Sequence, residues 1–135
     1  MMLRVVIQAR WKVVTTVGED GRCALVEFLD GLEGELSGDR VKVLRRLRYL
    51  AEQGIIRNEE QSRRIEGADR VFELKGGAVR VFYFFDRDCI VICSHGVLKP
   101  KKKQVLGEAR KAELLREEVA RARQVGALVI EEEGR

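Results

Sequence analysis

The sequence predicts an α+β fold in which two N-terminal helices and a C-terminal helix pack on a small, antiparallel-dominated sheet. Three observations support this prediction: two segments near the N-terminus with apolar residues at helical spacing, three strand-like segments separated by short turns, and one long helical segment after them. Elements segregated in this way are typical of α+β proteins. With 135 residues, 45% of them hydrophobic, the chain is expected to form a single domain, residues 1–135, with its core in 1–123 and a tail without an assigned element in 124–135.

The N-terminal part is expected to contain one strand and two helices. Met2–Val17 is rich in Val, Ile and Thr and alternates polar and apolar residues over its middle, which predicts one strand. Arg22–Glu33 has apolar residues at helical spacing. A second helix is expected to have Ser37 as its N-cap and to stop at Gly54, and the two helices are expected to pack antiparallel across a short link.

Three successive strands are expected in the middle of the chain. Val71–Lys75 and Val79–Phe85 flank a Gly-Gly pair, which is typical of a β-hairpin. In the second of these strands, alternate side chains are expected on opposite faces. Cys89–Leu98 is apolar almost throughout and is therefore expected to be a central strand covered on both faces.

The remaining segments connect or follow these strands. Ile55–Asp69 is expected to be a polar connection that buries only Ile65. Gln104–Gln124 is rich in Glu, Arg, Ala and Leu and predicts a helix. The pattern of Ala127–Ile130 leaves open whether this apolar segment adds a strand.

Composition argues against several classes of protein. The longest apolar stretch without a charge, Cys89–Leu98, is about half the length of a membrane-spanning helix, and Arg4 interrupts the apolar N-terminus. No membrane association is therefore expected. The odd number of cysteines, without a Cys-x-x-Cys pair, predicts free thiols and a cytoplasmic location. Two of them, Cys89 and Cys93, are expected on one strand face with His95, but too spread out for a metal site.

Positive charge is concentrated in one segment. Gly96–Lys111 carries six cations and one anion, a net charge of +5 that exceeds the +4 of the whole chain. Such a strip beside a rigid sheet favours binding of a polyanion. The second predicted helix is also basic, but Arg45 and Arg46 are expected to be mostly a solvated face.

Several segments together resemble a known family. Val71–Lys75 is followed by Val79–Phe85, then by His95–Lys99, and then by Val105–Arg110. Their order and spacing resemble the HigB-type branch of the RelE/ParE toxin superfamily, which includes phage-derived HigB-like toxins. The chain differs from that pattern where Lys75 replaces an arginine and where Pro100 comes early in the lysine-rich segment.

The resemblance implies a RelE-like fold and the toxin of a toxin–antitoxin pair. Such toxins are ribosome-dependent, metal-independent endoribonucleases that cleave mRNA, so the expected partners are mRNA, the ribosome and a cognate helix-turn-helix antitoxin, and no cofactor is expected. Two alternatives stay open: a ParE-like gyrase inhibitor of the same fold, and an inactive basic nucleic-acid-binding module.

Four residues are candidates for the catalytic site implied by the resemblance. Arg80 would bind the phosphate through two parallel hydrogen bonds, and Lys75 across the turn would share it or carry a proton. The only histidine is His95, and an unperturbed imidazole titrates near neutral pH, which suits acid–base chemistry, although a histidine in a strand is more often packed. Lys99 would neutralise the leaving group. The candidate RNA-binding residues are Lys99, Lys101, Lys102 and Lys103.

Overall fold

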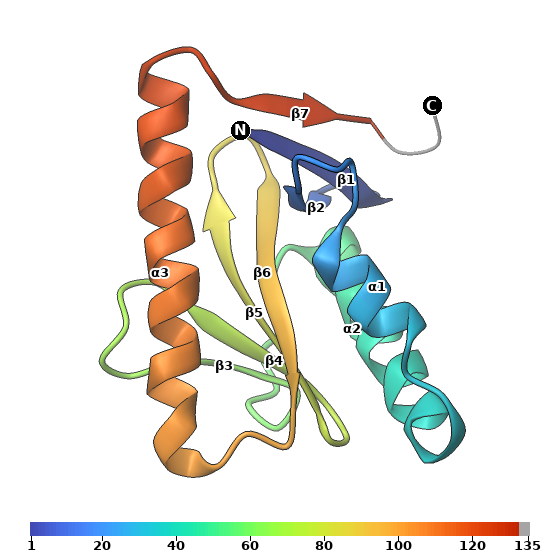
Figure 1. Ribbon diagram of the computed structural model, residues 1–135. Coiled ribbons are helices and arrows are strands. Elements are labelled where there is room, and N and C mark those ends of the chain that lie inside the picture. Colours follow the sequence, from blue (N-terminus) through green and yellow to red (C-terminus); the bar gives the residue numbers. More distant parts are fainter. Residues whose placement is uncertain (133–135) are drawn as a thin grey trace.

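One mixed sheet of seven strands organises the chain, in the spatial order β3-β4-β5-β6-β2-β1-β7 (Figure 1). The structure, a computed structural model, describes residues 1–132. The strands are β1 (Met2–Gln8), β2 (Lys12–Val17), β3 (Ser62–Arg64), β4 (Phe72–Gly76), β5 (Val79–Asp86), β6 (Ile90–Leu98) and β7 (Val129–Glu131). The helices are α1 (Ala24–Asp30), the 3-10 turn η1 (Gly34–Leu36), α2 (Ser37–Gln53) and α3 (Lys102–Gln124).

The N-terminal segment forms a hairpin, so the prediction of one strand over Met2–Val17 is wrong. β1 and β2 pair antiparallel from Met2↔Val17 to Gln8↔Lys12. The turn between them contains no Gly, Pro or Asn that would have marked it. It is stabilised by a tertiary contact instead, because the backbone N–H of Trp11 donates to the carbonyl of Ala51 in α2 at 2.7 Å.

The sheet is mixed, so the antiparallel dominance that the sequence predicted is confirmed only in part. Four neighbouring pairs are antiparallel, but β2 pairs parallel with β6 and β7 pairs parallel with β1. The β2–β6 pairing joins the N-terminal hairpin to the central meander, from Lys12↔Ile90 to Thr15↔Cys93. β6 is therefore central and buried on both faces over Ile90–Cys93, as its apolar sequence predicts.

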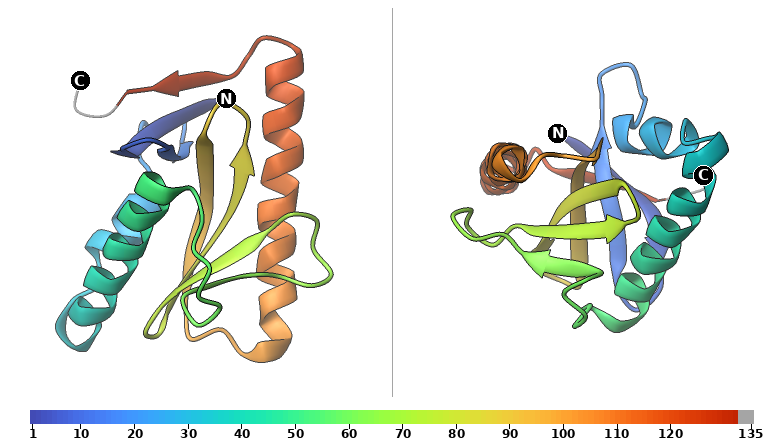
Figure 2. Two further views of the ribbon diagram at one scale, coloured as in Figure 1. Left: turned by 180° about the vertical axis from the view of Figure 1, so that it is seen from behind. Right: turned by 90° about the horizontal axis from the view of Figure 1, so that it is seen from below.

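The helices cover the two faces of the sheet separately (Figure 2). α1 and α2 pack on one face around a core that includes Val43, Leu47 and Tyr83. α3 packs on the other face, where Ala109 and Ala112 belong to the same buried core cluster as Phe82. The helix arrangement expected from the sequence is confirmed only in part, because α1 has just seven residues and reaches α2 through η1.

The two faces of β5 carry different side chains, as the alternation predicts. Val79, Val81 and Tyr83 belong to the core under α1 and α2. Phe82 and Phe84 belong to cores on the α3 face, and both are at most 1% exposed. These aromatic rings are therefore core residues and do not form an exposed stacking platform.

One end of α2 lies where the sequence predicts it, and the other end differs by one residue. Gly54 ends the helix with a left-handed φ of 77°, and an added Cβ there would lie 2.4 Å from Trp11 Nε1. Both facts require glycine. Ser37 is the first helical residue and not the N-cap, because η1 leads into the helix and Leu36 takes the cap position.

The connection between α2 and β4 is more ordered than its polar sequence indicates. It contains strand β3, which pairs antiparallel with β4. It also buries Ile56, Ser62 and Ala68 in addition to the expected Ile65. The hydroxyl of Ser62 forms a 2.6 Å hydrogen bond with the hydroxyl of Tyr83, which ties this segment to the sheet.

The tail adds a strand, a question that the sequence left open. β7 extends the sheet beside β1, with Leu3 opposite Ile130. The Nε atom of Arg4 lies 2.6 Å from Glu131 Oε1 across this pairing. Residues 133–135 lie outside the described part of the chain. Among the helices that are described, none has the length and apolarity needed to span a bilayer.

Only one of the three cysteines is expected to react rapidly in the folded protein. All three thiols are free; Cys23 and Cys93 are buried, and Cys89 is exposed. Burial raises the pKa of Cys93 to about 12, which suppresses its reactive thiolate. Titration with a thiol reagent at neutral pH should therefore detect one fast thiol in native protein and three in denaturant. Rapid reaction of two or more native thiols would contradict this packing.

Candidate active site

Two cross-strand rows of side chains form the candidate site, on the α3 face of the sheet. The first row runs across four strands and consists of Arg63, Glu73, Phe82 and His95. The second row is its neighbour toward the β4–β5 turn and consists of Lys75, Arg80 and Val97. Directly opposed residues in antiparallel strands have Cβ atoms about 5 Å apart, so Lys75 and Arg80 are neighbours, as the hairpin predicts.

Arg80 is held at the turn of the β4–β5 hairpin. Its Nη1 donates to the carbonyl of Gly77 at 2.6 Å and to that of Val79 at 3.0 Å. Its Nε lies 3.7 Å from Glu73 Oε2, and one quarter of the side chain is exposed. The guanidinium is thus oriented by protein groups, while part of it stays open to a ligand.

Lys75 extends in another direction. Its Nζ donates to the carbonyl of Glu59 at 3.3 Å, in the connection before β3. The backbone carbonyl of Lys75 accepts a hydrogen bond from Arg46 of α2. The expectation that Arg46 belongs to a solvated face is therefore wrong, because this side chain crosses to the sheet and anchors the strand that carries Lys75.

A buried carboxylate connects the arginines of the site. The Glu73 side chain is 2% exposed, and its Oε1 lies 3.0 Å from Nε of Arg63 in β3. The same carboxylate faces Arg80 on β5. Because a buried charge is costly unless it is paired, Glu73 requires these two cations and holds them on either side of β4.

Sequence reasoning overlooked both Arg63 and Glu73. The signal for Glu73 was a carboxylate between the apolar residues Phe72 and Leu74 in a predicted strand, which indicates a paired buried charge. Arg63 offered no comparable signal, because its segment is polar throughout. Its importance follows from the tertiary pairing with β4.

The lysine-rich segment leaves the sheet beside the β4–β5 turn. The backbone N–H of Lys99 donates to the carbonyl of Ala78 at 2.8 Å, which places Lys99 close to the hairpin that carries Arg80. Lys101 is the N-cap of α3, and Lys102 and Lys103 are exposed in its first turn, which contains no acidic residue. Cations at the positive end of a helix are electrostatically unfavourable. An anionic ligand at this end would relieve that repulsion.

A groove of about 990 Å³ lies beside this cluster. Its charged lining consists of the basic residues Arg57, Arg63, Arg64 and Lys102 and of the two carboxylates of Glu59 and Glu66. Lys75, Arg80 and Lys99 do not line it. Arg63 is the link between the two regions, because it lines the groove and also shares Glu73 with Arg80. The structure thus brings Lys102 together with arginines of the connection that the sequence analysis did not single out.

His95 lies on the α3 face because of a β-bulge. The register between β5 and β6 shifts by one residue at Ser94, so that Phe82 faces His95 while Tyr83 faces Cys93. The expectation that His95 shares a strand face with Cys89 and Cys93 is therefore wrong. The imidazole stacks on the Phe82 ring with centroids 5.3 Å apart.

Both ring nitrogens of His95 have partners. Nδ1 lies 2.8 Å from Ser94 Oγ, and Nε2 lies 2.9 Å from Glu108 Oε1 of α3. Burial lowers the pKa of His95, although Glu108 acts in the opposite direction. The neutral ring therefore donates from Nε2 to the carboxylate and accepts from the Ser94 hydroxyl, which ties β6 to α3.

The His95–Glu108 contact predicts a loss of stability as the pH falls. Burial raises the pKa of Glu108, but hydrogen bonds from Lys111 and His95 outweigh it and hold the pKa below its ordinary value of 4.5. The pKa values of His95 and Glu108 are both lower in the folded protein than in the unfolded chain. As the pH falls, both groups are therefore protonated at a higher pH in the unfolded chain than in the folded protein. The free energy of unfolding should therefore fall as the pH drops through about 6.5 and further toward 4.5.

Urea denaturation at pH 7.5 and pH 5.5 tests this prediction. The decrease in unfolding free energy between these values should be smaller in His95→Gln, since glutamine does not titrate. The other ionisable groups are common to both proteins and cancel in the comparison. An equal decrease in both would show that His95 is not responsible.

Comparison with known proteins agrees with this architecture. Residues 27–117 match the model of the family described as phage-derived protein Gp49-like (DUF891). A chain in the crystal structure of the archaeal RelE–RelB complex from Pyrococcus horikoshii OT3 superposes with a TM-score of 0.50 at 15% identity. That match covers 67% of this chain and 97% of the other, so the two share a fold. No curated protein matches the sequence. The family match covers most of the chain and spans Lys75, Arg80, His95 and the lysine-rich segment, and the protein therefore belongs to the phage-derived Gp49-like family.

Proposed function

We propose that this protein is the toxin of a toxin–antitoxin pair and an endoribonuclease that cleaves mRNA on the ribosome. The Gp49-like family and the RelE-like fold support the toxin assignment. The observation that carries the nuclease assignment is the pair of Arg63 and Arg80 held by the buried carboxylate of Glu73, with Lys75 as the cross-strand neighbour of Arg80. This cluster lies beside a lysine-rich helix start, which suits a polyanionic substrate.

The chemistry is attack of a ribose 2′-hydroxyl on the adjacent phosphorus. The P–O5′ bond breaks, which leaves a 2′,3′-cyclic phosphate and a 5′-hydroxyl end. The transition state carries extra negative charge on the phosphoryl oxygens, and preorganised cations stabilise it. In the proposed mechanism Arg80 binds these oxygens, because protein carbonyls and Glu73 already orient its guanidinium.

The proton transfers fall to neighbouring groups. We assign the Lys75 amine, the direct cross-strand neighbour of Arg80, to accept the proton of the 2′-hydroxyl, and the Lys99 ammonium to donate a proton to the leaving O5′. Lys99 would neutralise the leaving oxygen, and Lys101, Lys102 and Lys103 would hold the RNA backbone. The contacts of His95 with Ser94 and Glu108 favour a structural role over acid–base chemistry, and the pH experiment above addresses that role. The chain's own cations supply the charge in this scheme, without a metal ion.

The expected protein partner is a cognate antitoxin, in our proposal one with a helix-turn-helix DNA-binding domain. Support comes from the similar archaeal structure, which is a RelE–RelB complex. An antitoxin that covers the Arg80 cluster would block RNA by occupying the same surface.

The decisive experiment is translation in vitro with defined mRNA and purified ribosomes. Added protein should produce mRNA fragments with 5′-hydroxyl ends, and these fragments should be absent when ribosomes are omitted. Intact mRNA together with inhibited DNA gyrase would instead support the ParE-like alternative. Intact mRNA and normal gyrase activity, with RNA binding retained, would indicate an inactive binding module.

A further inference from the structure

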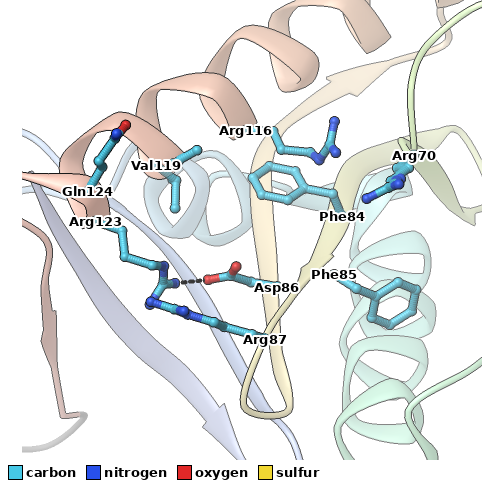
Figure 3. A pocket seen from close by; sticks show the side chains of 10 residues that line it. Arg70, Phe84, Phe85, Asp86, Arg87, Arg116, Val119, Arg123 and Gln124 are labelled. Atoms are coloured by element: carbon cyan, nitrogen blue, oxygen red, sulfur yellow. Dashed lines mark hydrogen bonds and ion pairs between the residues drawn. The ribbon is translucent and has the colours of Figure 1, made fainter.

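A second basic cavity lies at the far end of α3. It has a volume of about 540 Å³ and is formed by the end of β5, the β5–β6 turn, the C-terminal half of α3 and Arg70 in the loop before β4. Figure 3 shows its side chains around Phe84 and Asp86. The strand rise of about 3.3 Å per residue puts Asp86 about 20 Å from Arg80 along β5. The cavity is therefore separate from the proposed catalytic cluster at Arg80.

Four arginines and one carboxylate line this cavity. Arg123 is paired with Asp86, and Nη1 of Arg116 lies 2.9 Å from Asp69 Oδ2. These two guanidiniums are about one quarter exposed and are held in place. Arg70 is 73% exposed and only loosely paired with Asp69, at 3.9 Å. Arg87 is exposed and has no ion pair with any residue in the range 1–132. The cavity therefore presents unneutralised positive charge at its rim.

The two basic hollows lie along the same helix. The groove described above borders the first turns of α3 at Lys102, Val105 and Leu106, and the second cavity borders its last turns from Arg116 to Gln124. The loop before β4 crosses α3 between them, where the backbone N–H of Asp69 donates to Glu113. A 23-residue helix is about 34 Å long. Basic groups near both ends of this helix match an extended polyanionic ligand.

We propose that the second cavity is a phosphodiester-binding site that holds an RNA strand lying along α3. Arginine suits this ligand because its planar guanidinium donates two parallel hydrogen bonds to one phosphate. In this proposal the cavity and the cluster at Arg80 are two separate contacts for RNA. Binding of RNA in the cavity does not require cleavage at Arg80.

Binding of a single-stranded 2′-O-methyl RNA tests the proposal, because this RNA lacks the nucleophile and stays intact whether or not the protein is a nuclease. The variant is Arg70→Gln with Arg87→Gln. The control is Arg45→Gln with Arg48→Gln, two exposed positions on α2, on the opposite face of the sheet. Both variants lose two positive charges, so they have the same net charge. Thermal unfolding of each protein confirms that the fold is intact.

The expected result is weaker binding in the cavity variant and a smaller dependence of log affinity on log salt. If each arginine contacts one phosphate, the slope of log affinity against log salt concentration should be smaller by about 1.4 in the cavity variant than in the wild type. The control variant should keep the wild-type slope. Equal slopes in the two variants would overturn the proposal, since the effect would then reflect net charge alone. A poly-glutamate peptide provides a second test. If the peptide binds the wild type and binds the cavity variant more weakly, while RNA binding is the same in both, the proposal is overturned. The ligand of the cavity would then be an acidic protein segment.

Discussion

Replacing Arg80 by alanine is expected to lower the rate of ribosome-dependent mRNA cleavage by about 100-fold or more. The guanidinium is preorganised by the carbonyls of Gly77 and Val79 and by Glu73, so in the proposed mechanism it stabilises the transition state without reorganising. Loss of one such preorganised donor in other enzymes reduces the rate by about 100- to 1,000-fold. Single-turnover cleavage of mRNA in a ribosomal complex measures the change.

Two further variants make this result interpretable. Arg80→Lys keeps the charge but loses the bidentate geometry, and we expect it to stay well below the wild-type rate. Arg48→Ala removes an exposed arginine from α2 on the other face of the sheet and should leave the rate within a factor of about two. Wild-type cleavage by a folded Arg80→Ala protein would place the reaction elsewhere in the molecule and refute the assignment.

Replacing Glu73 by alanine is expected to lower the free energy of unfolding by about 2 kcal/mol. Removing one partner of a fully buried ion pair typically costs about 3–5 kcal/mol. Here the arginine side chains are 25% and 45% exposed, so water can solvate them partly and the loss is smaller. Urea denaturation measures the change. Cleavage should also decrease, because Arg63 and Arg80 lose their common anchor.

Matched acidic positions provide the control for Glu73. Glu117→Ala removes an exposed carboxylate from α3 and should change the stability by less than about 0.5 kcal/mol. Glu73→Gln keeps the size of the side chain and separates the loss of charge from the loss of packing. A Glu73→Ala protein as stable as Glu117→Ala would mean that the buried carboxylate does not hold the two arginines.

Local patterns predicted the elements whose stabilisation is local. The Gly-Gly turn between two alternating segments predicted the β4–β5 hairpin, and its register places Lys75 opposite Arg80. The apolar Ile90–Cys93 stretch predicted a central strand, and Gly54 predicted the end of α2. In each case neighbouring residues carry the information, through turn geometry, burial on both faces or a left-handed φ.

The N-terminal hairpin and the face on which His95 lies depended on distant contacts. The reversal at Trp11 requires the carbonyl of Ala51, forty residues further along the chain. The bulge at Ser94 moves His95 onto the α3 face, and a shift of one residue in register reverses the face of a side chain. Neither event leaves a periodic pattern in the sequence around it.

From its residues alone, the chain specified an α+β architecture, a basic segment after the last central strand and the pairing of Lys75 with Arg80, because composition, periodicity and turn chemistry act over a few residues. Three-dimensional packing added what those patterns do not contain: the parallel joining of β2 to β6, the carboxylate of Glu73 shared between Arg63 and Arg80, and the contact of His95 with Glu108. These contacts join residues that are separated in sequence, and their free energy arises from burying charge and hydrogen-bonding groups together, which no single segment can do.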